Sequence, residues 1–179
     1  KNGMKVALLP KRTRGKSVKV MAAIRFGTEK TLAAKRMASF LAAPMLVRGT
    51  TKHSYQEIKD KFDALRAEVS FGGFDPNGAV GQAVVSISTV RENLPAVLDL
   101  VGEVLRQPTF PKQEFETLRK EILAQLEEEL QKPDELAMNA LAKKVDPQPK
   151  NDVRYTLSPA EAIAQVKAVT PAQVSAVYK

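Results

Sequence analysis

Four stretches of the chain have the hydrophobic pattern of β-strands. Residues 18–26 alternate, with Val18, Val20, Ala22, Ile24 and Phe26 on one face, which is typical of a strand with one buried side. Residues 4–9 form a short apolar run that ends before Pro10, and residues 67–71 and 80–89 flank a Gly- and Asn-rich turn at residues 72–78. We therefore expect an antiparallel pair from the first two stretches and a hairpin from the last two.

Longer stretches have the 3.6-residue period of helices. Residues 31–50 are rich in Ala, Leu and Met and predict a mostly buried helix that is kinked at Pro44, carries Arg48 in its last turn and ends at Gly49. Further helices are predicted at residues 55–65, 94–106, 112–131 and 133–145, and two short ones after residue 158 and after residue 170.

The predicted helix starts and buried faces follow from local sequence. Ser54 with Glu57 and Ser158 with Glu161 have the spacing of capping boxes, and Asn93 is the expected cap of the helix at residues 94–106. Three apolar stripes predict buried faces: Ile58, Phe62 and Leu65; Leu94, Val97, Leu98, Val101, Val104 and Leu105; Phe115, Leu118, Ile122, Leu126 and Leu130.

Composition and charge narrow the function classes. The chain has 179 residues, no Cys and one His, His53, so disulfides, thiolate zinc sites and Cys nucleophiles are excluded. Residues 1–60 carry 14 Lys and Arg against 3 Asp and Glu, whereas residues 61–179 carry 14 against 17. A basic half of this kind indicates a solvated surface or a face for an acidic partner, and no aromatic residues accompany the basic cluster at residues 11–16 to stack nucleic-acid bases.

Several strings together resemble the pitrilysin/insulinase family of zinc metallopeptidases, which includes the mitochondrial processing peptidases. They are Met45-Leu46-Val47-Arg48-Gly49-Thr50, the helix that begins at Asn93-Leu94-Pro95, the string Pro108-Thr109-Phe110-Pro111 and the closing Val169-Thr170-Pro171. The order and spacing of the predicted elements resemble the family over essentially the whole chain.

The resemblance also places the family's zinc site on this sequence. Active members carry His-x-x-Glu-His directly before the Met, and two Glu residues seven apart on the long helix that follows. Here the first set of places falls on Phe40, Ala43 and Pro44, and the second on Leu118 and Gln125. None of these five side chains is a good zinc ligand or a general base, so we expect neither a catalytic residue nor a metal ligand in this chain.

The resemblance implies a fold and a function. The expected fold is α+β, an antiparallel sheet packed with helices, as in the half-domain of the mitochondrial processing peptidase type. We expect residues 1–179 to form one such half-domain, a fragment of a longer chain. It would be the non-catalytic half of a zinc metalloendopeptidase, inactive alone, that pairs with a zinc-bearing half in the same chain or in a separate subunit and encloses a chamber for an unfolded peptide. Zinc would then be a cofactor of the partner half only, and the location would be the periplasm, as for many bacterial members.

Two other interpretations stay open. The domain could be a purely structural subunit without a peptidase partner, or a basic module that binds anionic surfaces or nucleic acid through residues 1–19. Neither His53 nor the acidic run Glu127-Glu128-Glu129 suggests another metal site, because zinc sites combine about three ligands; we expect His53 on the surface and the Glu run on a solvated helix face.

Overall fold

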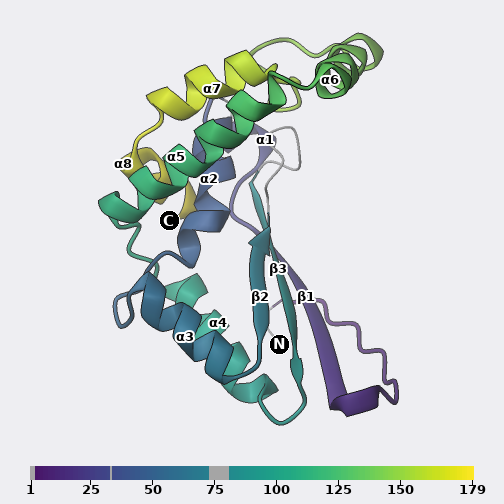
Figure 1. The fold of residues 1–179 in the computed structure, drawn as a ribbon, viewed down its shortest axis with the longest axis vertical. Helices are drawn as coiled ribbons and strands as arrows, with labels where there is room; N and C mark the ends of the chain where they lie inside the picture. Colours follow the sequence, from purple (N-terminus) through teal and green to yellow (C-terminus); the bar gives the residue numbers. More distant parts are fainter. Residues whose placement is uncertain (1–2, 33, 73–80) are drawn as a thin grey trace.

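The computed structural model describes residues 3–32, 34–72 and 81–179, and within these ranges it has the expected α+β architecture. A three-stranded antiparallel sheet has the order β1-β3-β2, with β1 at Ser17–Arg25, β2 at Glu68–Gly72 and β3 at Gln82–Val90 (Figure 1). In register, Val20 lies opposite Ile87 of β3, and Val69 of β2 lies opposite the same residue on the other side. The predicted hairpin of β2 and β3 is therefore confirmed, while residues 73–78 of its turn lie outside the described residues.

One sheet face is buried and the other is open. Ala83, Val85 and Ile87 of β3 are buried, with the alternating residues of β1 and β2 beside them in the core. The opposite face presents Lys19, Met21 and Ala23 of β1, which are exposed, next to half-buried Ser86 and Ser88 of β3. This difference follows from the two-residue period of a strand.

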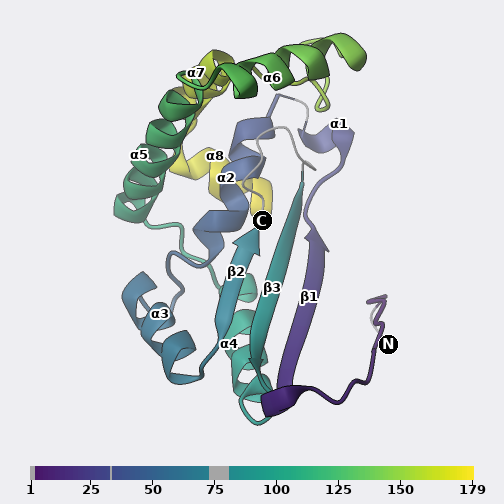
Figure 2. The ribbon, with the colours of Figure 1, turned by 45° about the vertical axis from the view of Figure 1, so that its right-hand side comes forward.

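The helix α2 (Arg36–Leu46) is central to the fold. Every residue of α2 except Phe40 is buried, and the helix contacts β2 and β3 as well as α5 (Lys112–Glu129), α7 (Pro159–Ala168) and α8 (Pro171–Tyr178). Figure 2 shows these helices stacked beside one end of the sheet, with α3 (Tyr55–Ala64) and α4 (Leu94–Arg106) at the other end. The buried helix predicted over residues 31–50 thus exists, but it is shorter.

The predicted helix at residues 31–50 is interrupted near its start. A four-residue helix, α1 (Glu29–Leu32), is followed by Ala34 with a φ of +61°, and α2 begins only at Arg36. A left-handed residue breaks the helical hydrogen-bond ladder, so the two pieces cannot be continuous. At the other end, α2 runs through Pro44 and stops at Leu46, which leaves Arg48 just outside the helix. The kink predicted at Pro44 stays a prediction.

The prediction of a strand at residues 4–9 is wrong. Met4, Val6, Leu8 and Leu9 are exposed and the segment has no strand structure, while η1 (Arg14–Lys16), a short 3₁₀ helix, leads into β1. A strand is stabilised by a hydrogen-bonded neighbour, and within the described part of the chain β1 pairs with β3 and not with this segment. The apolar run therefore lacks both a ladder and a face on which to pack.

Three predictions at helix positions also need correction. Asn93 stands at the N-cap position of α4, but its side chain accepts no capping hydrogen bond, and its amide Nδ2 donates to the carbonyl oxygen of Leu65 at 2.8 Å. Leu98 is 44% exposed and Leu130 is 36% exposed, so neither belongs to the core. In α4 the buried stripe is Val97, Leu100, Val101 and Val104, which turns Leu98 towards solvent.

Several other predicted features are confirmed. Ser54 and Ser158 both form complete capping boxes, with Glu57 and Glu161 respectively. The long helix α5 buries Phe115, Leu118, Ile122 and Leu126, and α6 (Pro133–Val145) begins at the expected proline. Glu127 and Glu128 of the acidic run are exposed on α5, and Glu128 pairs with Lys132.

Candidate functional site

The three places on α2 that resemble a zinc-binding motif are filled by packing residues. Ala43 and Pro44 are buried in the core, and Phe40 is half-buried with its ring packed against the core. No atom of these side chains has a lone pair that could bind a metal ion or accept a proton. Their role in this chain is to hold α2 against its neighbours.

The two places on α5 differ from each other in burial. Leu118 is fully buried in the same core as Ala43. Gln125 is exposed, and its amide nitrogen donates to the Glu129 carboxylate at 3.4 Å, one turn further along α5. A neutral amide that faces solvent is a poor substitute for a carboxylate ligand of zinc.

These residues do not fit a zinc ion. A structural or catalytic zinc site takes at least three nitrogen, oxygen or sulfur ligands. Across residues 3–32, 34–72 and 81–179, no three His, Cys, Asp or Glu side chains lie close enough together to hold a metal. The arrangement around α2 and α5 therefore offers hydrophobic packing and no metal chemistry.

The loop after α2 meets the loop between α4 and α5, which brings two strings of the sequence together in space. The Thr109 amide donates to the Gly49 carbonyl at 3.0 Å, the Thr51 amide donates to the Gln107 carbonyl at 3.1 Å, and Thr50 forms a β-bridge with Pro108. We call residues 49–51 together with residues 107–109 the loop clamp.

Gly49 is required by the geometry of the loop clamp. Its φ is +150°, and a Cβ atom at this position would lie 3.0 Å from the Pro111 ring and 3.2 Å from the Thr109 hydroxyl. A glycine at residue 49 thus permits both the backbone conformation and the close approach. The Gly-Thr and Pro-Thr-Phe-Pro strings are mutually dependent parts of one contact.

Arg48 is a nearly buried cation beside the loop clamp. Its guanidinium lies 2.6 Å from Glu121 and 3.5 Å from Glu114 on α5, and stacks over the Tyr55 ring at 4.7 Å. Burial alone would lower the pKa of Arg48, but the hydrogen bond to Glu121 and the neighbouring charges raise it above its usual value. Arg48 therefore stays charged and joins the end of α2 to α3 and α5.

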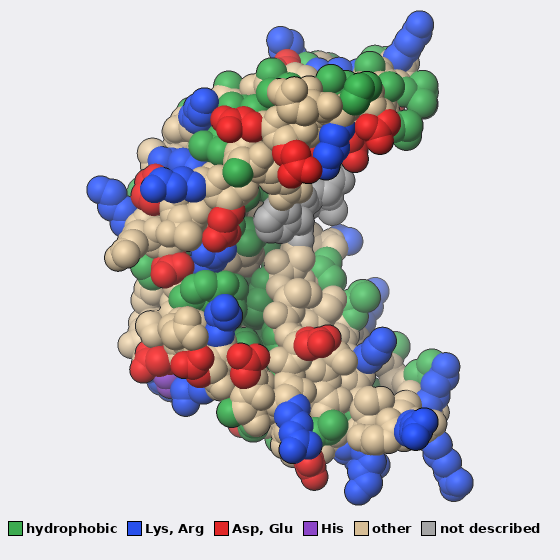
Figure 3. Space-filling view, viewed as in Figure 1, with side chains coloured by type: hydrophobic (Ala, Val, Ile, Leu, Met, Phe, Trp, Pro, Cys, Tyr) green, Lys and Arg blue, Asp and Glu red, His purple; other side chains and the backbone are tan. Residues whose placement is uncertain are grey.

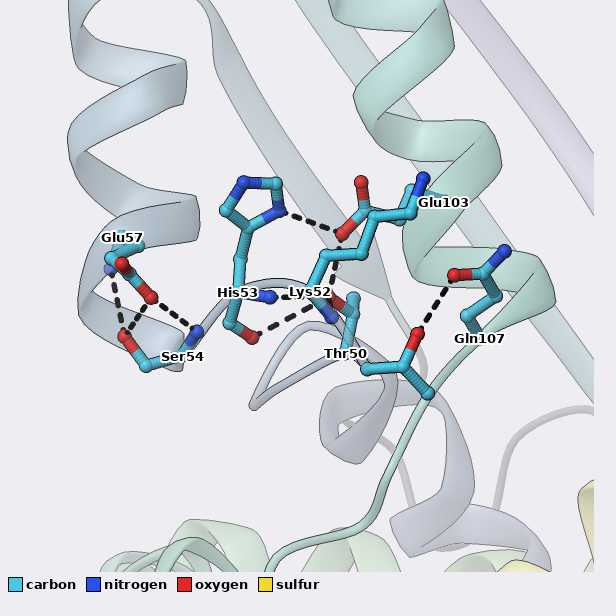
Figure 4. A network of polar contacts seen from close by, with 8 residues as sticks. Thr50, Lys52, His53, Ser54, Glu57, Glu103 and Gln107 are labelled. Carbon is cyan, nitrogen blue, oxygen red and sulfur yellow. Dashed lines mark hydrogen bonds and ion pairs between the residues drawn. The ribbon is translucent and has the colours of Figure 1, made fainter.

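A polar network on the other side of the loop clamp includes the one histidine (Figure 4). Glu103 of α4 lies 2.8 Å from Nδ1 of His53 and accepts a hydrogen bond from the Thr50 hydroxyl at 2.6 Å. Desolvation opposes ionisation of Glu103, but the hydrogen bonds from Thr50 and His53 outweigh it, so the pKa of Glu103 is lowered.

His53 is not the surface residue that the sequence suggested, because its side chain is only 23% exposed and is paired with Glu103. The pairing of His53 with Glu103 could not be predicted from the sequence, because no motif surrounds Glu103 on its amphipathic helix. In this network His53 has a carboxylate and a hydroxyl as neighbours, which orient the loop before α3.

An open groove of about 820 Å³ lies between α3 and the sheet. Tyr55, Lys59 and Phe62 of α3 line one side of it. Val69, Ser70 and Ser88 from β2 and β3 line the other. In the described part of the chain β2 pairs with β3 alone, so its outer edge borders this groove with backbone groups available.

Comparison with known proteins gives a family and several similar folds. The sequence pattern of the insulinase family (peptidase family M16) matches residues 8–149. The chain is 22% identical to the peptidase M16 inactive domain from Pseudomonas fluorescens, with a TM-score of 0.71. The matched region covers 91% of this chain and 38% of the Pseudomonas chain. Among curated proteins none matches.

Two further solved structures have a similar fold. A conserved protein from Enterococcus faecalis is 16% identical, with a TM-score of 0.69 and coverage of 91% of this chain and 40% of that one. The periplasmic protease PqqL from Escherichia coli is 18% identical, with a TM-score of 0.67. That match covers 91% of this chain and 18% of the PqqL chain. The chain thus spans less than half the length of each of these proteins, and at these identities the likeness shows the fold.

Proposed function

Because the chain belongs to the insulinase family (peptidase family M16), we propose that it acts as the non-catalytic half of a zinc metalloendopeptidase. It pairs with a zinc-bearing half, in the same chain or in a separate subunit, and the two enclose a chamber for an unfolded peptide. Zinc belongs to the partner half. The chain by itself hydrolyses nothing.

One observation carries this proposal. The fold of an M16 domain is kept, but Ala43 and Leu118 at two of the site positions are packing residues of the core, and Phe40, Pro44 and Gln125 complete a set without a metal ligand. A single such residue would lower zinc affinity, whereas five of them on two helices remove the basis for a metal site. What the domain then contributes is its surface and its shape.

The concave side of the molecule supports a role in peptide binding. Figure 3 shows the molecule hollowed on this side, and the groove of about 820 Å³ between α3 and the sheet opens here. An extended peptide can add to the outer edge of β2 through backbone hydrogen bonds, which requires no particular side-chain sequence. A chamber that accepts unfolded peptides of many sequences needs such a surface.

The periplasm is the proposed location. PqqL, which shares the fold, is a periplasmic protease. Within residues 3–32, 34–72 and 81–179, no helix has both the length and the apolar character needed to cross a membrane.

Zinc and activity assays test the proposed function. The dialysed chain should contain less than about 0.1 zinc per molecule by plasma emission and should not cleave an unstructured fluorogenic peptide. Addition of the half that carries His-x-x-Glu-His, identified from the neighbouring sequence of the parent chain or its operon, should form a stable complex with activity. Stoichiometric zinc in this chain, or full activity of the other half alone, would overturn the proposal.

A pair of variants tests the groove in that complex. Ser88→Arg places a bulky cation in the groove and should raise KM for the peptide with little change in kcat, since it obstructs binding rather than chemistry. Gln113→Arg on the exposed side of α5 is the matched control and should change neither constant. Equal effects of both variants would exclude the groove as a peptide-binding surface.

A second candidate function rests on the basic amino-terminal region. Lys11, Arg12, Arg14 and Lys16 are all exposed. If this cluster binds nucleic acid or anionic lipid, retention on heparin or DNA should fall steeply between about 50 and 200 mM salt, because bound counterions are released. Absence of retention at the lower salt concentration would exclude this function.

A further inference from the structure

The helix α6 turns polar side chains towards the rest of the chain and apolar side chains towards solvent, the opposite of an ordinary surface helix. Its inward side makes polar contacts: Asn139 donates to the Leu157 carbonyl at 2.7 Å, and Lys143 pairs with Glu161 at 2.8 Å and donates to the Tyr155 hydroxyl at 3.3 Å. Met138 is 63% exposed, Leu141 is 53% exposed and Val145 is 74% exposed. An amphipathic helix normally places such apolar residues against its own core.

Met138, Leu141 and Val145 form one continuous stripe, and Leu136, which is 38% exposed, lies outside it. Residues 138, 141 and 145 are separated by three and four positions, which puts them on one helix face, and Asn139 and Lys143 lie on the opposite face. Figure 3 shows hydrophobic side chains gathered at the upper right, where Figure 1 places α6. We call Met138, Leu141 and Val145 the α6 stripe.

The charges at the ends of α6 identify a fitting partner. Asp134 and Glu135 lie in the first turn and exposed Lys144 lies in the last, whereas Lys143 of the last turn faces inward and pairs with Glu161. When two such helices pack antiparallel about a two-fold axis, the acidic end of each meets the basic end of the other, while Met138 lies across from Leu141 of the second helix. The α6 stripe and its flanking charges therefore complement the same surface on a second copy of the chain.

We propose that the α6 stripe is a self-association surface, on which a second copy of this chain packs its own α6 in the antiparallel direction. The interface is isologous, as in most homodimers. One pair of helices buries less than the roughly 1,600 Å² of a standard stable interface. We therefore expect a weak dimer that forms at high micromolar concentration.

Sedimentation equilibrium of the 179-residue chain from 10 to 500 μM tests this proposal. The apparent mass should rise with concentration from the 19.6 kDa monomer towards twice that value. Leu141→Lys should raise the dimer Kd at least tenfold, since it puts a cation at the centre of the stripe. Leu98→Lys, which changes a leucine on α4 that is 44% exposed, is the matched control and should leave Kd unchanged.

A charge exchange tests the antiparallel geometry separately. Asp134→Lys should weaken the dimer by placing like charges together, and the double variant Asp134→Lys with Lys144→Asp should restore it. Circular dichroism of each variant verifies that α6 and the fold are intact.

Three outcomes would overturn the proposal. They are a monomer at every concentration, a dimer that Leu141→Lys leaves intact, and a stripe protected from hydrogen exchange only when the zinc-bearing half is added. The last result would assign the stripe to contact between the two halves and would leave the proposed function standing.

Discussion

Arg48 joins the end of α2 to α3 and α5 through its side chain. Its guanidinium contacts Glu114 and Glu121 of α5 and the Tyr55 ring of α3. Arg48→Met keeps most of the aliphatic volume and removes the charge, so it should lower the free energy of unfolding by about 1–3 kcal/mol. Urea denaturation followed by circular dichroism measures the change. Arg91→Met, on the exposed turn after β3, should stay within about 0.5 kcal/mol of the wild type.

Gly49 should tolerate no side chain. Gly49→Ala adds a Cβ atom 3.0 Å from Pro111 at a backbone φ of +150°, and should destabilise the domain by about 1–3 kcal/mol. Gly15→Ala separates the two causes, because Gly15 also has a positive φ, +70°, but has no atom within 4 Å of an added Cβ. Equal losses for both variants in urea denaturation would mean that backbone conformation, and not the close approach, explains Gly49.

Local sequence predicted those polar contacts whose partners lie within one turn. Ser54 and Ser158 form capping boxes as expected, because each motif contains both of its partners. Asn93 forms no side-chain cap, and its amide group instead donates to the Leu65 carbonyl, which only the fold brings near. The pairing of His53 with Glu103 was missed for the same reason.

The packing of α2 against α5 should prevent simple restoration of a zinc site. Ala43→Glu places a carboxylate at a position that is 1% exposed. We expect it to destabilise the domain by about 3 kcal/mol or more. Gln125→Glu makes the equivalent exchange at an exposed position and should be almost neutral. Thermal unfolding of both variants measures the difference, and a stable Ala43→Glu protein would show that the core adapts to the charge.

Periodicity predicted most helices and strands here, because it reports which side of an element is buried. It failed at residues 4–9, where a short apolar run predicts a strand but pairing decides whether one forms. It also failed at Ala34, since a left-handed residue that is not glycine leaves no mark in the composition of the helix around it. For α6 the helix was predicted, but the sequence alone could not tell which face turns inward.

Acid should lower the free energy of unfolding of the domain, because it protonates Glu161. The hydrogen bond from Lys143, with those from the Ser158 backbone and hydroxyl, lowers the pKa of this carboxyl in the folded state. The unfolded chain therefore binds protons more readily, and the stabilisation that is present above about pH 5 is lost as the pH falls. Urea denaturation from pH 7 to pH 3 should show this decline.

Glu161→Gln and Lys143→Met should each give a lower free energy of unfolding at pH 7 and a shallower loss on acidification. The first removes the titrating group, and the second removes the cation that contributes most to its lowered pKa. Slopes equal to that of the wild type would assign the acid sensitivity to other carboxyl groups.

The loop clamp also has a kinetic consequence. It joins residues far apart in sequence, since Thr50 of the clamp and Glu103 next to the clamp are 53 positions apart. Closing a loop of this length costs about 3.5 kcal/mol of chain entropy, so such contacts form late, after α3, the β2–β3 hairpin and α4 have assembled within the loop. We therefore expect changes in the clamp to accelerate unfolding more than they slow folding. The clamp would then determine how long the folded state persists rather than how fast it is reached.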